Sequence, residues 1–195
     1  MRRGAAIAIL AVLLLSGCTQ RYDSPDDRSE AFGDAVAEQL RDVDTTPDDL
    51  RVYGGFDGIV FDAFLDRRSF AETRAFIESA RSAADDSPLG DLPVRFVLSH
   101  RDTGQGTGTL EWRGYDPARS DRYYAALRLW LDVLADPGVQ IKEKFEVEAA
   151  TVFASVEVSD GRGLEAYRTQ LVEAFQAAGF PEPRVEVEVE AARVP

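Results

Sequence analysis

The stretch Val185-Glu186-Val187-Glu188-Val189-Glu190 alternates strictly between valine and glutamate. Successive side chains of a β-strand point to opposite faces of a sheet, so a strand here would separate its valines from its glutamates. The pattern therefore predicts a sheet with one face packed against helices and the other in water. Val94, Phe96 and Leu98 alternate in the same way earlier in the chain.

These two alternating stretches lie 91 residues apart, and other matching residues share the interval: Leu40 and Leu131, and Ala63 and Ala154. Each half of the chain reads helix, two strands, helix, strand, which indicates an internal repeat. We therefore predict an α+β fold of duplicated helix-hairpin-helix-strand units, with antiparallel sheets backed by helices on one face. The first repeat would cover residues 24–115 and the second residues 116–195.

Apolar residues at helical spacing, together with capping signals, predict four helices in this region. These are residues 24–43, 69–84, 116–134 and 163–175. Alternating or continuous apolar stretches bounded by turn residues predict the strands. These are residues 50–53, 59–65, 94–98, 109–113, 139–148, 151–158 and 185–190.

The N-terminus has the layout of a cleaved export signal. Arg2 and Arg3 precede the apolar run Ala5–Leu15, which is too short to span a bilayer. The run ends in Leu15-Ser16-Gly17-Cys18, which resembles the lipobox of bacterial lipoproteins. The resemblance implies cleavage between Gly17 and Cys18, a diacylglycerol on the Cys18 thiol and an acylated new N-terminus. We expect a signal peptide at 1–17, a tether at 18–23, and a lipid-anchored protein on the extracytoplasmic face of the cell membrane.

The net charge of the chain limits the classes of molecule that it can bind. The chain carries 22 basic and 35 acidic residues, for a net charge of −13. Such a surface is repelled by phosphates, which excludes nucleic acid as a partner. Anionic lipid head groups would repel it too, so we expect the acyl chains to hold it at the membrane. Cys18 is the only cysteine and has no disulfide partner in the chain.

Two kinds of candidate site residue stand out. Glu186, Glu188 and Glu190 would share one strand face and are candidates for a divalent-cation site, with a solvated sheet face as the alternative. The sequence contains no calcium-loop motif, and we expect neither a metal nor a cofactor. Trp112 alternates with Glu111 and Arg113, and we expect it on an edge strand as a candidate binding aromatic.

A catalytic constellation is not evident. His100 is the only histidine, and its neighbour Ser99 would point to the opposite strand face. We therefore interpret His100 as an ordinary strand-end residue. The sequence favours a non-catalytic module that binds an envelope protein or takes part in envelope assembly. The alternatives are a hydrolase that uses carboxylates, or a small-ligand-binding lipoprotein with a pocket between the two halves.

Overall fold

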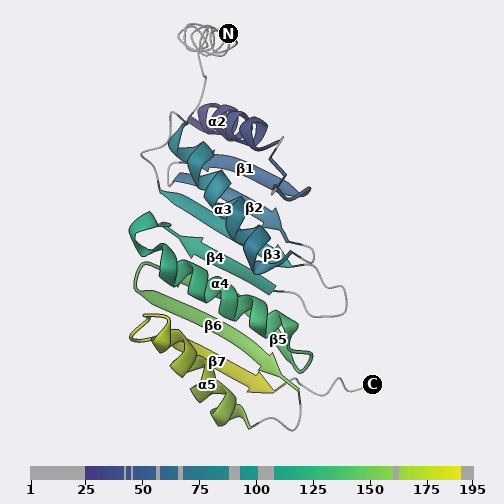
Figure 1. Ribbon diagram of the computed structural model, residues 1–195, viewed down its shortest axis with the longest axis vertical. Helices are drawn as coiled ribbons and strands as arrows, with labels where there is room; N and C mark the ends of the chain where they lie inside the picture. Colours follow the sequence, from purple (N-terminus) through teal and green to yellow (C-terminus); the bar gives the residue numbers. More distant parts are fainter. Residues whose placement is uncertain are drawn as a thin grey trace, which may run out of the picture.

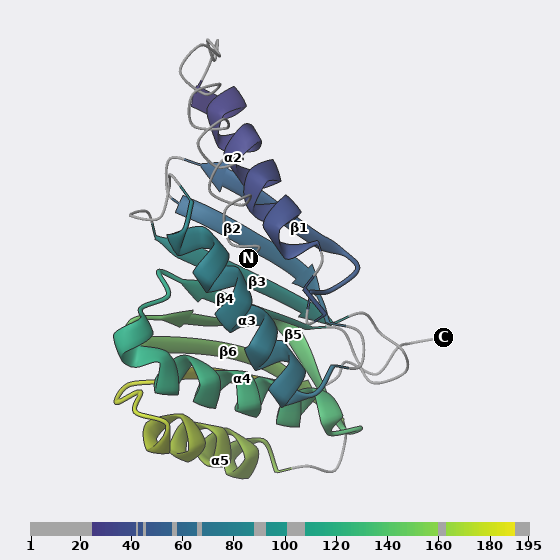
Figure 2. The same cartoon turned by 45° about the horizontal axis from the view of Figure 1, so that its top comes forward.

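The computed structural model describes residues 25–41, 43–44, 46–55, 58–65, 68–87, 93–100, 108–159 and 163–189. Within these ranges one seven-stranded sheet carries four α-helices on a single face, as Figure 1 and Figure 2 show. The expected signal peptide 1–17, the tether 18–23 with Cys18, and Glu190 lie outside the described residues.

Each predicted helix and strand corresponds to an element of the structure. The helices are α2 (Pro25–Leu40), α3 (Phe70–Asp85), α4 (Ser120–Ala135) and α5 (Leu164–Ala177), with a short 3₁₀ turn η1 (Pro117–Arg119) before α4. The strands are β1 (Leu50–Gly55), β2 (Gly58–Phe64), β3 (Val94–His100), β4 (Gly108–Arg113), β5 (Val139–Glu148), β6 (Thr151–Val158) and β7 (Arg184–Val189).

The expectation of antiparallel sheets is wrong, because the sheet is mixed. The strands follow sequence order, and the pairs β1–β2, β3–β4 and β5–β6 are antiparallel. The pairs β2–β3, β4–β5 and β6–β7 are parallel. Parallel neighbours need a crossover connection, and α3, α4 and α5 supply one each. The β4–β5 pairing also joins the predicted halves 24–115 and 116–195 into one sheet.

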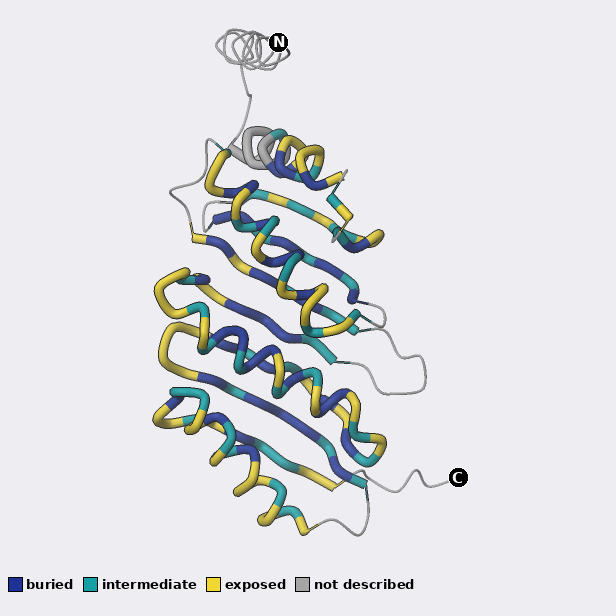
Figure 3. The backbone as a smooth tube through the Cα atoms, viewed as in Figure 1, coloured by how far each residue is buried: buried dark blue, intermediate teal, exposed yellow. Residues whose placement is uncertain are grey.

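The core lies between the sheet and its helices. Figure 3 shows buried and more exposed residues alternating along several strands. At β7 the helix-facing side is only partly covered: Val185 is buried, Val187 is half-buried and Val189 is 42% exposed. The reason is that β7 is an edge strand with a single neighbouring strand. The valines and glutamates of β7 therefore differ less in burial than the sequence predicts.

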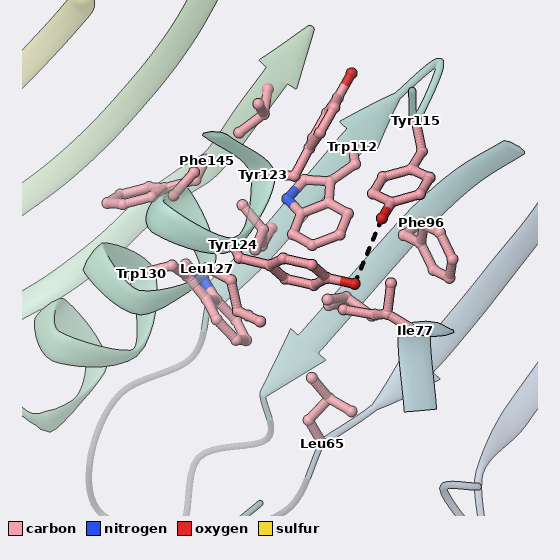
Figure 4. Close-up of a cluster of buried hydrophobic side chains, with 14 of the residues drawn as sticks. Leu65, Ile77, Phe96, Trp112, Tyr115, Tyr123, Tyr124, Leu127, Trp130 and Phe145 are labelled. Carbon is pink, nitrogen blue, oxygen red and sulfur yellow. Dashed lines mark hydrogen bonds between the residues drawn. The ribbon is translucent and has the colours of Figure 1, made fainter. Parts of the chain in front are cut away.

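Trp112 belongs to this core, and the expectation of an edge strand is wrong. β4 lies between β3 and β5, and the Trp112 side chain is fully buried. Its ring centroid lies 5.8 Å from that of Phe96, 5.7 Å from that of Tyr115 and 5.3 Å from that of Tyr123 (Figure 4). Trp112 therefore packs the centre of the molecule and is not an exposed aromatic of a binding site.

Candidate functional site

A pocket of about 660 Å³ lies at the edge of the sheet where β2 and β3 end. Because these strands are parallel, their carboxyl ends meet at that edge. The walls come from the residues just before and at the start of α3, the last residue of β3 and the last turns of α4. The volume suits a small organic molecule. Both predicted halves contribute to the pocket.

The start of α3 is fixed by a capping box. The Ser69 hydroxyl accepts a hydrogen bond from the backbone N–H of Glu72 at 3.3 Å, and the Glu72 carboxylate accepts one from the backbone N–H of Ser69 at 2.8 Å. Hydrogen bonds from the side chain and backbone of Ser69 lower the pKa of Glu72. The capping box fixes the backbone between Arg68 and Phe70, which line the pocket on either side of Ser69.

Two arginines line this pocket. Arg68 donates through Nη2 to the backbone carbonyl of Thr46 at 2.8 Å. The Arg128 guanidinium lies over the Phe70 ring, 4.5 Å from its centroid, in a cation–π contact. Among the residues that the structure describes, Asp132 is the acid that lines the same pocket. Glu72 adds a second carboxylate nearby, since the charge of Arg68 contributes, after the hydrogen bonds of Ser69, to lowering the pKa of Glu72.

His100 also lines the pocket. Its Nδ1 atom is buried, and no hydrogen-bond partner for it is found in the part of the chain that the structure describes. The sequence indicates His100 only as a strand-end residue, and no spacing rule connects it with Arg68 or Arg128. Only the order of the strands in the sheet could have indicated that Arg68 and His100 lie near each other, because β2 and β3 end at the same edge of the sheet.

The opposite face of the sheet carries a network of charges centred on Glu111. This side chain is only 6% exposed, and its carboxylate lies 2.6 Å from Arg95 Nη2, 2.5 Å from Arg113 Nε and 3.0 Å from Lys144 Nζ. Burial acts to raise the pKa of Glu111. Hydrogen bonds from Arg113 and Lys144, with the charge of Arg95, outweigh burial and lower this pKa. Glu111 therefore stays ionised as a structural ion-pair centre.

The glutamates of β7 are paired with cations. Glu186 lies 2.7 Å from Arg184, and Glu188 pairs with Lys142. Both line a second hollow of about 310 Å³ beside α5, together with Glu165. Over the described ranges, no group of three or more His, Cys, Asp or Glu side chains is placed to hold a metal ion. This arrangement favours the interpretation of a solvated, ion-paired sheet face.

No protein-family model matches the chain, and a comparison with curated proteins finds no match. None of the helices that the structure describes is long and apolar enough to cross a membrane.

Proposed function

We propose that this protein is a lipid-anchored extracytoplasmic binding module without catalytic activity, and that the pocket at the start of α3 is its ligand site. The observation that carries the proposal is the pocket itself: it lies between α3 and α4, and both halves of the chain line it. Among the lining residues that the structure describes, Asp132 is the one carboxylate. Two-carboxylate hydrolysis needs a pair of acids flanking the substrate, so the pocket favours binding over hydrolysis.

The anchor in this proposal is the acyl chains on Cys18. The described fold begins at Pro25, so the tether 18–23 would hold the domain close to the membrane. The net charge of −13 makes the protein surface a poor ligand for anionic lipids, which leaves the acyl chains as the attachment. The ligand pocket would then face the extracytoplasmic space.

Replacing Cys18 with serine should abolish lipidation and signal cleavage. We expect mass spectrometry of wild-type protein, made in a bacterial host that processes lipoproteins, to find an N-terminal peptide that begins at acylated Cys18. The variant should keep its N-terminal run unacylated. Ser16→Ala is the control, because a small residue remains before the cysteine, and it should be processed normally. An unmodified Cys18 in the wild-type protein would refute the anchor.

Replacing Ala135 with tryptophan should fill the pocket. Ala135 is an exposed residue that lines it, so the indole can enter the hollow without disturbing the core. We expect native mass spectrometry of wild-type protein from envelope fractions to detect a bound small molecule that the variant lacks. Ala118→Trp is the control, since Ala118 is exposed and lies in η1, outside the pocket lining. A molecule retained equally by both variants would show that the pocket is not the ligand site.

We further propose that the two halves arose by duplication. Each half contains a hairpin followed by a helix and a strand that pairs in parallel with the second hairpin strand. The registers differ, because Leu98 pairs with Ala63 whereas Val185 pairs with Ala154. The 91-residue interval therefore relates Ala63 to Ala154 in the hairpins, but it does not relate residues of β3 and β7 that occupy equivalent places in the pairing.

A further inference from the structure

We infer that the ligand of the pocket is a small organic anion. Its carboxylate or phosphate group would lie among Arg68, Arg128 and His100, and its apolar part would pack against Phe70 and Leu131. This inference rests on the proposed function, because it assumes that the pocket is a ligand site. It adds the chemical class of the ligand.

The charged residues that line the pocket indicate the charge of its ligand. Arg68 and Arg128 come from separate elements, the residues before α3 and the exposed side of α4, yet they line one pocket. The contact with the Thr46 carbonyl and the stacking on Phe70 hold their guanidinium groups in place. A planar guanidinium group presents several N–H donors in a geometry that matches carboxylate and phosphate oxygens. Two such groups in one pocket offer an anion a fork of N–H donors, and the nearby carboxylates of Asp132 and Glu72 leave those donors directed at ligand oxygens only where the guanidinium edges face the pocket.

The pocket lies on a protein whose net charge is strongly negative. With a net charge of −13, the chain as a whole repels anions. Arg68 and Arg128 bring two guanidinium groups to one pocket of this acidic protein. The His100 imidazole lines the same pocket and adds a polar ring that can donate a hydrogen bond. An anion in this pocket would therefore meet two guanidinium groups and one imidazole.

The size of the pocket and its apolar lining indicate that the ligand also has a hydrocarbon part. A pocket of about 660 Å³ is far larger than an inorganic phosphate or acetate ion needs. Phe70, Leu131 and Leu134 supply apolar side chains to its lining. Such a lining gains free energy only when apolar ligand surface is buried against it. The ligand class is thus an anion that carries a hydrocarbon part.

The test is calorimetric titration of the full-length protein with three probes: 4-phenylbutyrate, benzyl phosphate and the uncharged 4-phenylbutyramide. We expect at least one anion to bind saturably, with the amide at least about tenfold weaker, the ratio that corresponds to 1.4 kcal/mol. The tighter anion identifies the preferred head group. Arg128→Gln should weaken anion binding by about tenfold and leave amide binding unchanged. Arg119→Gln, which removes an arginine outside the pocket lining, should change neither.

Arg128 is exposed, so its substitution should not affect folding, and it remains a valid test if Arg68→Gln destabilises the protein. Equal affinity for the amide and the anions, with all binding lost in Ala135→Trp, would overturn the anion inference while supporting the ligand site. Anion binding that Arg128→Gln leaves unchanged would also overturn the inference. Absence of binding by both anions would overturn the inference. It would overturn the proposed function as well if the wild-type protein also carries no small molecule from the envelope.

Discussion

Replacing Gly58 with alanine should destabilise the fold by about 4 kcal/mol or prevent folding. Gly58 begins β2 with φ of +129°, a conformation that L-residues with a side chain rarely adopt. A Cβ atom there would lie 1.9 Å from the backbone carbonyl oxygen of Pro93, at the point where β2 and β3 start side by side. That oxygen also accepts a hydrogen bond from the N–H of Ile59 at 3.0 Å, so it cannot move away without losing the bond.

Gly114→Ala is the matched control for this experiment. Gly114 also has a positive φ, +62°, but a Cβ atom would meet nothing within 4 Å. Gly114→Ala should lower the free energy of unfolding by about 1 kcal/mol, because alanine is strained in the left-handed backbone conformation. Urea unfolding followed by circular dichroism gives both values. Equal, small losses for the two variants would contradict the close approach of β2 to Pro93.

Replacing Glu111 with glutamine should lower the free energy of unfolding by about 2 kcal/mol at neutral pH. The substitution keeps the shape of the side chain but removes the charge that faces Arg95, Arg113 and Lys144. Glu146 would still pair with Arg113 and Lys144, but Arg95 would lose its partner and the three cations would share one carboxylate instead of two. Glu143→Gln is the control, because Glu143 is an exposed residue of the neighbouring strand, and it should change stability by less than about 0.5 kcal/mol.

The cost of Glu111→Gln should depend on pH. The pKa of Glu111 in the folded protein is lowered from its ordinary value of 4.5. The ionised form therefore adds stability above pH 4.5, and this contribution is lost as the pH falls through the lowered pKa. We expect the difference between wild type and variant to be constant near neutrality and to shrink in acid below pH 4.5. A difference that stays the same in acid would show that the charge of Glu111 does not stabilise the fold.

The sequence predicted the elements of the fold better than their arrangement. Alternation in Val94–Leu98 and Val185–Val189 located two strands, because period-two burial leaves a direct trace in residue order. Strand order and the direction of pairing depend on where each crossover helix packs, which no local pattern records. The sequence alone therefore suggests an edge strand for Trp112, whereas parallel pairing of β4 with β5 places it at the centre.

The candidate site shows the same limit. His100 is the only histidine in the sequence, but Arg68 and Arg128, which line the same pocket, are distant from it in sequence and follow no motif. They come together because β2 and β3 end at one edge and because α4 packs beside α3. Ordinary surface arginines have the same appearance in a sequence. A pocket made in this way becomes visible only when the topology is known.

Nuclear magnetic resonance on the isotope-labelled full-length protein tests the central claim, that this pocket is the ligand site, most directly. Titration with 4-phenylbutyrate should shift the signals of residues that line the pocket, with Phe70, His100 and Arg128 among the most affected. In the Ala135→Trp variant these shifts should disappear. Shifts centred instead on the opposite sheet face around Glu111, or shifts that Ala135→Trp leaves unchanged, would contradict the claim.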